Sequence, residues 1–273
     1  MIKSDCHMHT CFSADSEATV TSMLDAAVEK GLEGVCITDH MDLDFPETPD
    51  FPANAFQFDL DEYFGQLNRL KEQYKGKLDL RIGVEIGLQK HLGEAYHRLT
   101  EAYPFDFVIG SVHLVGGQDP YYRKIFDGRT DEEVYRMAFR EILENVEAVK
   151  DFDALGHLDY VVRYGIHQAA EYSYRKFSDE IDAVLKKLIA EGKGLEMNLA
   201  GIKYGLGFPN PHPDVLKRYR ELGGEIITIG ADAHEPAHVA YEFEKATEIL
   251  RECGFSYYAE FHGRKPVFQR IVP

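Results

Sequence analysis

Short apolar runs alternate with longer amphipathic segments along this chain. Seven runs have the length and composition of buried parallel strands, and they cover residues 2–9, 34–38, 80–86, 105–112, 153–157, 194–198 and 225–230. Between them, apolar positions recur with helical spacing over residues 19–30, 60–74, 93–101, 131–149, 178–190, 213–222 and 241–253. This alternation predicts parallel strands that are joined by helical crossovers.

Capping signals agree with these boundaries. Thr130 and Ser178 each precede an acidic first turn, as helix N-caps do. Several of the predicted helices end at a glycine, namely Gly31, Gly192, Gly223 and Gly254. The chain has 273 residues, no linker rich in Pro, Gly or Ser, and no internal repeat. We therefore expect one α/β barrel domain over residues 1–273.

Two further segments fall outside this alternation. The loop 42–54 contains Pro46, Pro49 and Pro52 and several phenylalanines. It is either a lid over a site or an ordered surface loop that is packed by its own side chains. The tail, residues 257–272, is rich in aromatic and β-branched residues and predicts an outlying strand.

Composition and charge restrict the class of protein. No run of 18 apolar residues is present, so we expect no membrane span. The N-terminus leads directly into a strand pattern without a signal peptide, which favours a cytoplasmic location. The formal net charge of −17 argues against a nucleic-acid partner. It is compatible with an anionic substrate, because bound cations reverse the local charge of a site. The four cysteines form no C-x-x-C pair, and Cys6 and Cys36 are predicted to be inert buried thiols.

Ionisable residues stand at the ends of most of the predicted strands. His7 and His9 are one residue apart on an extended strand, so their side chains point the same way. Other strands end at or near an imidazole or a carboxylate, and the complete set is His7, His9, Asp15, His40, Glu85, His113, His157, Asp232 and His234. Because barrel active sites lie at the C-terminal ends of the strands, these side chains should converge.

The size of this set indicates a hydrolytic metal centre. For any single histidine, an ordinary buried residue is a competing interpretation. A structural zinc uses four ligands, and a catalytic zinc uses three and a water molecule. Nine nitrogen and oxygen donors therefore predict two or three divalent cations, with a carboxylate such as Glu85 as a bridge.

The same residues carry a family resemblance. The motifs are Asp5-Cys6-His7-Met8-His9-Thr10, Ser13-Ala14-Asp15-Ser16, Thr38-Asp39-His40, Gly83-Val84-Glu85, Gly110-Ser111-Val112-His113, Gly156-His157-Leu158-Asp159 and Gly230-Ala231-Asp232-Ala233-His234. In this order they resemble the polymerase and histidinol phosphatase (PHP) family, and most closely its stand-alone histidinol-phosphate phosphatase branch. The resemblance implies a distorted TIM-like barrel of seven strands, (β/α)7.

The resemblance also implies a trinuclear metal centre of manganese, iron or zinc. One metal would bind His7, His9, Glu85 and Asp232; a second would bind Glu85, His113 and His157; and a third would bind Asp15, His40 and His234. The segment from His157 to Gly165 resembles the part of the branch in which an arginine, here Arg163, binds the substrate phosphate. The segment around Lys203 resembles a second basic position, where the branch commonly has arginine. A lysine there binds phosphate without the two-pronged geometry of a guanidinium, and a surface ion pair is its alternative role.

The reaction expected from this resemblance is hydrolysis of a phosphate monoester, specifically L-histidinol phosphate of histidine biosynthesis. A hydroxide that bridges two metals would attack phosphorus, and Asp232 or His234 would protonate the leaving alkoxide. Three alternatives stay open. They are a PHP phosphoesterase acting on nucleotide monophosphates or small phosphodiesters, an amidohydrolase-type barrel that cleaves C–N bonds, and a non-catalytic interaction module stabilised by metal. A panel of phosphate esters distinguishes the first of these.

Overall fold

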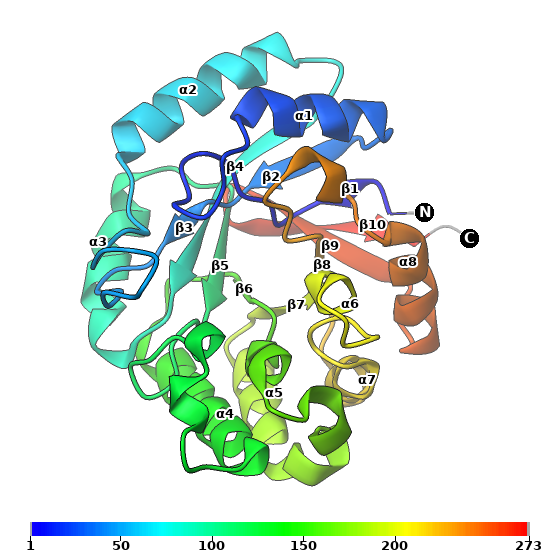
Figure 1. Cartoon of the computed structure of the whole chain (residues 1–273). Helices are drawn as coiled ribbons and strands as arrows, with labels where there is room; N and C mark the ends of the chain where they lie inside the picture. The colour runs from blue at the N-terminus through cyan, green and yellow to red at the C-terminus, as the bar shows by residue number, and fades with distance from the viewer. Residues whose placement is uncertain (1, 272–273) are drawn as a thin grey trace.

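The strands of the protein form a parallel barrel with helices around it (Figure 1). The structure is a computed structural model and describes residues 2–271. The barrel strands are β1 (Ser4–Asp5), β2 (Gly34–Ile37), β3 (His40–Met41), β4 (Asp79–Gly87), β5 (Phe107–Ser111), β6 (Ala154–Leu155), β7 (Gly194–Asn198) and β8 (Ile227–Gly230). Their order around the sheet is β1-β2-β4-β5-β6-β7-β8, and β3 extends the path of β2 alongside β4. The predicted seven-stranded α/β barrel is confirmed.

Backbone hydrogen bonds close the barrel between its first and last strands. The amide of Cys6 donates to the carbonyl of Ile229 over 2.9 Å, and the amide of Asp232 donates to the carbonyl of His7 over 2.9 Å. Met8 and Ala233 form an isolated parallel bridge above these bonds. The chain that carries His7 is therefore fixed directly beside the chain that carries Asp232.

The helices lie outside the strands, with buried apolar faces against the sheet (Figure 1). Their bounds are α1 (Val20–Glu29), α2 (Leu60–Gln73), α3 (Gly93–Ala102), α4 (Asp131–Ala148), α5 (Ser178–Ala190), α6 (Ala200–Lys203), α7 (Pro213–Glu221) and α8 (Phe243–Glu252). Thr130 forms a reciprocal capping box with Glu133 at the start of α4. The four glycines predicted to end helices all have positive φ, at which an L side chain is strained. None of the helices within residues 2–271 has both the length and the apolar character needed to cross a bilayer.

Short 3₁₀ helices fill the long connections at the C-terminal side of the barrel, and the sequence pattern did not predict them. They are η1 (Lys90–Leu92), η2 (Pro120–Tyr122), η3 (Lys124–Phe126), η4 (Tyr160–Tyr164), η5 (Gln168–Glu171), η6 (Tyr174–Phe177) and η7 (Pro236–His238). Each is too short to show a helical hydrophobic period.

The tail closes the N-terminal end of the barrel. It forms an antiparallel hairpin of β9 (Tyr257–His262) and β10 (Lys265–Arg270), so the tail holds two strands where one outlying strand was expected. Phe261 stacks on Phe107 with ring centroids 4.8 Å apart. The fully buried Arg81 donates from Nη1 to Glu260 over 3.2 Å. This hairpin seals the end of the barrel away from the predicted site.

Two predicted strands are shorter than expected. The strand expected over residues 2–9 pairs regularly only at Ser4–Asp5, and the strand expected over 153–157 only at Ala154–Leu155. In both cases the missing part carries the histidines, whose backbone leaves the regular ladder at the edge of the barrel. Cys6 and Cys36 are buried free thiols, as predicted.

Candidate metal centre

The structure brings all nine predicted side chains together at the C-terminal end of the barrel. His7 and His9 follow β1, His40 begins β3, Glu85 lies within β4, and the remaining members lie in the segments after β1, β5, β6 and β8. Four groups within this cluster have donor atoms close enough to share an ion: His9 with His40 and His234; His7 with His9 and Glu85; His40 with Asp42 and His113; and Glu85 with His113 and His157.

Glu85 lies at the middle of the cluster and is fully buried. Its Oε2 is 3.1 Å from Nε2 of His7 and 3.4 Å from Nε2 of His9. Its Oε1 is 3.2 Å from Nε2 of His113 and 3.0 Å from Nε2 of His157. Oε2 is also 3.0 Å from Nδ1 of His40. The two carboxylate oxygens therefore face two different groups of imidazoles, as a bridging carboxylate needs.

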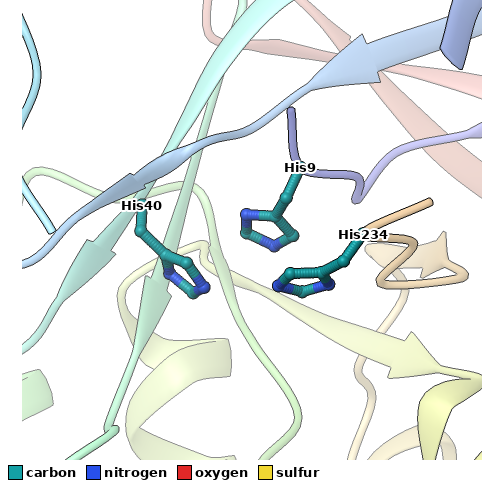
Figure 2. A group of neighbouring side chains, drawn as sticks. All are labelled: His9, His40 and His234. Atoms are coloured by element: carbon teal, nitrogen blue, oxygen red, sulfur yellow. The ribbon is translucent and has the colours of Figure 1, made fainter. Parts of the chain in front are cut away.

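A third group of side chains lies at the more open side of the cluster. Nε2 of His234 is 3.1 Å from Oδ2 of Asp15, and Nε2 of His40 is 3.7 Å from the same oxygen. The ring of His9 stacks on both His40 and His234, with centroid distances of 4.1 and 4.2 Å. Figure 2 shows these three imidazoles converging from separate segments.

Hydrogen bonds at the outer ring nitrogens fix the tautomers of several of these histidines. Nδ1 of His7 is 2.6 Å from Oε1 of Glu196, and Nδ1 of His113 is 2.6 Å from Oδ2 of Asp42. Nδ1 of His234 is 3.2 Å from the carbonyl oxygen of Asp232. Each outer nitrogen is thus the donor, so in the neutral imidazole it is Nε2 that presents a lone pair to the interior of the cluster.

His9 follows the same rule through a hydroxyl group. Its Nδ1 lies 3.2 Å from Oγ of Ser13, and that hydroxyl donates its proton to Asp39 over 2.7 Å. The Nε2 atoms of His7 and His9 are 3.0 Å apart, a contact that requires a proton or a cation between the two nitrogens. The donor set of imidazoles and carboxylates, with outer partners that orient the rings, fits divalent transition metals.

The charges of the cluster shift the pKa values of its members strongly. Burial lowers the pKa of His7, but the nearby carboxylates Glu196 and Glu85 outweigh burial and hold it well above its usual value. Burial and the neighbouring His40 and His234 push the pKa of His9 well below its usual value. Burial raises the pKa of Glu85, yet the surrounding histidines hold it well below the ordinary range. The centre therefore favours ionised carboxylates, which is the form that binds cations.

Three carboxylates that orient this cluster were not among the predicted site residues. Glu196 accepts from the amide of His157 over 2.9 Å with the oxygen that does not face His7. Asp42 orients His113, and Asp39 fixes the loop at Thr10 and Ser13. All three are buried. Glu196 is a single acidic residue within β7, and Asp39 and Asp42 stand on either side of the short β3, so nothing in the sequence indicated that these residues orient the histidines.

A cavity of about 610 Å³ opens over the cluster. Phe45, Phe51 and Phe56 form part of its wall, and Tyr122 connects their loop to the opposite side by donating to Asp50 over 2.9 Å. Phe45 and Phe56 also pack on each other and on Leu114. The loop is therefore packed by its own side chains and covers the site at the same time, so both interpretations of it hold in part.

Arg163 lines this cavity with its guanidinium buried between two tyrosines. Its Cζ lies 5.0 Å from the ring centroid of Tyr160 and 5.1 Å from that of Tyr204. Its Nε donates to Oδ1 of Asn210 over 2.8 Å, and its Nη2 donates to Oδ1 of Asn198 over 3.3 Å. The nearest carboxylate oxygen, Oδ2 of Asp232, is 3.8 Å from Nη2. The positive charge is thus held in place mainly by neutral amides.

Lys203 is not among the residues that line the cavity. Its Nζ donates to the backbone carbonyl of Asp232 over 3.4 Å and lies 4.8 Å from the ring centroid of Tyr204. Within residues 2–271 it forms no ion pair, so the surface ion pair considered as its alternative role is absent there. Partial burial lowers its pKa.

The chain is similar to known proteins along nearly its whole length. The model of the PHP domain family matches residues 5–200. A probable histidinol-phosphatase of Clostridium acetobutylicum is 33% identical over 264 residues, which is 97% of this chain and 95% of that protein. The histidinol-phosphatase of Lactococcus lactis subsp. lactis is 32% identical over 276 residues, covering 97% of this chain and 96% of that protein.

Two solved structures are similar to this chain in fold. The crystal structure of the Lactococcus lactis histidinol phosphate phosphatase, in complex with zinc, L-histidinol and phosphate, superposes with a TM-score of 0.87. It is 31% identical in sequence and covers 97% of this chain and 98% of that chain. A putative histidinol phosphatase from Listeria monocytogenes is 20% identical and shares the fold with a TM-score of 0.73, over 89% of this chain and 99% of that chain.

Proposed function

This chain belongs to the PHP domain family, and on that premise we propose that it hydrolyses L-histidinol phosphate to L-histidinol and inorganic phosphate. The observation that carries the proposal is Arg163, a buried cation held by neutral amides in the wall of a cavity whose floor is a cluster of imidazoles and carboxylates. A phosphate dianion meets there a guanidinium whose nearest carboxylate oxygen, Oδ2 of Asp232, is 3.8 Å away, so its charge is only partly neutralised. Relatives that are more than 30% identical along nearly the whole chain carry the histidinol-phosphatase name.

The nine clustered side chains would hold the metals. Glu85 is proposed as the bridge, since its two oxygens face different groups of imidazoles. The metals would be divalent manganese, iron or zinc, two or three per chain. When bound, such cations lower the pKa of water toward neutrality and neutralise the charge of a phosphate.

The remaining tasks fall to side chains of this protein. Arg163 would bind and orient the phosphate, and the aromatic wall would exclude bulk water from it. The leaving alcohol needs a proton, for which Asp232 and His234 are the proposed donors because both line the cavity. Asp232 has a φ of 53°, an uncommon conformation for a side chain other than glycine, of the kind that accumulates at functional sites. Asn198 donates to its Oδ2 over 3.2 Å and fixes its orientation.

The decisive experiment measures phosphate release from L-histidinol phosphate and from a nucleotide monophosphate, with elemental analysis of the same preparation. Rapid release that is selective for L-histidinol phosphate, with two to three transition metals per chain, is the expected result. Bound metal with no preference for L-histidinol phosphate would reject the substrate and leave a phosphatase of different specificity. Absence of both metal and activity, not restored by added manganese, would favour the non-catalytic module.

A further inference from the structure

Asn198, the last residue of β7, bonds to both the guanidinium of Arg163 and the carboxylate of Asp232. Its Oδ1 accepts from Nη2 of Arg163 over 3.3 Å, and its Nδ2 donates to Oδ2 of Asp232 over 3.2 Å. The two charged groups approach each other to 3.8 Å, measured from Nη2 to Oδ2. Opposite charges this close in a buried site attract strongly. One neutral amide therefore contacts both members of an ion pair that is not fully closed.

All four hydrogen-bonding positions of this amide are used. Besides Arg163 and Asp232, its Oδ1 accepts from the amide of Ala200 over 3.0 Å, and its Nδ2 donates to Oε2 of Glu196 over 3.3 Å. Turning the amide over would place its oxygen against two carboxylates and its nitrogen against two donors. The fully buried side chain of Asn198 therefore has one stable orientation.

The backbone of Asn198 is fixed as well. It exchanges two hydrogen bonds with the backbone of Asn210, each over 2.8 Å, and the amide of Leu199 donates to the carbonyl of Gly230 over 2.8 Å. The side chain of Asn210 accepts from Nε of Arg163. Two neutral oxygens on paired segments of the backbone thus hold the guanidinium in place.

We propose that Asn198 is a positioning residue that keeps Arg163 and Asp232 from closing into a direct ion pair. A closed pair would neutralise the cation that is proposed to bind phosphate. It would also draw Asp232 away from the metal cluster, where its Oδ1 now lies 3.4 Å from Nε2 of His9. The inference rests on the proposed function for the role of Arg163 toward phosphate, whereas its consequence for metal binding is measured without substrate.

The test removes the amide in two backgrounds and measures the affinity for zinc by competition with a chromophoric chelator. In the otherwise wild-type chain, Asn198→Ala should lower this affinity about 10- to 100-fold, because the freed guanidinium can reach Oδ2 of Asp232. In an Arg163→Gln background the same change should lower it by about threefold at most, since no cation is left to capture the carboxylate. An equal loss in both backgrounds would mean that Asn198 only orients Asp232, and this result would overturn the inference.

Phosphate binding gives a second readout. At saturating zinc, Asn198→Ala should raise the inhibition constant of inorganic phosphate about 10- to 100-fold. Asn198→Asp serves if the alanine variant does not fold, because it keeps the shape of the side chain and the two bonds accepted by Oδ1. Its carboxylate would itself neutralise Arg163, so the inhibition constant should rise by a similar factor. Inhibition constants that stay at the wild-type value in both variants would overturn the inference.

Asn145→Ala is the matched control. Asn145 is also a buried amide, but it lies on α4, where its Nδ2 donates to the carbonyl of Leu88 over 3.0 Å. Its loss should lower Tm and leave the affinity for zinc and the inhibition constant of phosphate within about twofold of the wild type. Equal effects of Asn145→Ala and Asn198→Ala would trace them to the loss of any buried amide and overturn the inference.

The zinc measurement also separates this inference from the proposed function. A wild type that binds zinc but does not hydrolyse L-histidinol phosphate would refute the proposed function. The comparison of Asn198→Ala in the two backgrounds would still decide whether Asn198 keeps Arg163 from Asp232, because it depends on zinc alone.

Discussion

Asn210 accepts a hydrogen bond from Nε of Arg163 over 2.8 Å and thereby orients a buried guanidinium without cancelling its charge. Asn210 is itself fixed, because its Nδ2 donates to Oδ1 of the buried Asp159 over 2.5 Å. Asp159 belongs to the Gly-His-Leu-Asp motif that also contains His157. One motif therefore supplies both an imidazole of the candidate metal centre and the support of the proposed phosphate-binding arginine.

Arg163→Lys should weaken phosphate binding although it conserves charge. Lysine cannot donate simultaneously to Asn210 and Asn198 and also present a planar pair of donors to phosphate. We expect kcat/KM for L-histidinol phosphate to fall about 10- to 100-fold and the inhibition constant of inorganic phosphate to rise by a similar factor. Arg140→Lys on the exposed face of α4 is the control, and steady-state kinetics is the measurement. An inhibition constant that stays at the wild-type value would remove Arg163 from the phosphate site.

Chelation of the metals should lower both activity and stability. Without cations the Nε2 lone pairs of His7 and His9 face each other over 3.0 Å, and this repulsion must be relieved by protons or by local opening. A metal at 100 times its dissociation constant adds about 2.7 kcal/mol to the free energy of unfolding, so its removal should lower Tm by several degrees. Calorimetry before and after treatment with a chelator, followed by addition of zinc or manganese, measures this change. A chelated protein that keeps its Tm and its activity would contradict the metal centre.

Much of the fold follows from local pattern. The helix predicted over residues 178–190 and the strand predicted over 194–198 have the bounds observed for α5 and β7, because a clear period and a terminal glycine delimit both. The hairpin of β9 and β10 was not predictable in this way. Most of β10 is exposed, so its sequence lacks the alternation by which a half-buried strand is recognised.

The residues of the candidate site fall into the same two classes, those that local sequence pattern predicts and those that it does not. Most of its nine clustered residues were predictable because they stand near the end of an apolar run, and the topology of a parallel barrel brings such ends together. Asp15 lies in the loop after β1 and was marked by its motif, Ser13-Ala14-Asp15-Ser16. The residues that orient these side chains, such as Glu196, were not predictable in this way. His7 and Glu196 are 189 residues apart, and only closure of the barrel brings Nδ1 of one within 2.6 Å of the other.

Asp42→Asn should weaken metal binding without removing any of the nine clustered side chains. Asp42 accepts from Nδ1 of His113 over 2.6 Å and makes the imidazole a stronger electron donor at Nε2. A neutral amide can still accept the hydrogen bond, but it lacks the negative charge of the carboxylate. The affinity for metal should therefore fall about 10- to 100-fold. Competition with a chromophoric chelator measures this affinity. Asp44→Asn, at an exposed site beside His91, is the control and should bind metal as the wild type does.

The ion pair between α5 and α7 should make stability depend on pH in an acidic window. The guanidinium of Arg218 donates to Asp182 through Nη2 over 2.7 Å, and this contact lowers the pKa of Asp182 from 3.8 to about 2. A carboxyl whose pKa is depressed on folding adds stability above its unfolded pKa, and the gain is lost as the pH falls through the folded pKa. Asp182→Asn should therefore lower the free energy of unfolding by about 1 kcal/mol at pH 7, since the pair is partly solvated. The difference from the wild type should close between about pH 4 and pH 2.

Urea denaturation across this range measures it, with Glu221→Gln as the control, because Glu221 forms only an exposed pair with Arg218 at 3.5 Å. A difference between Asp182→Asn and the wild type that is the same at pH 7 and pH 2 would show that the carboxylate charge is not the cause.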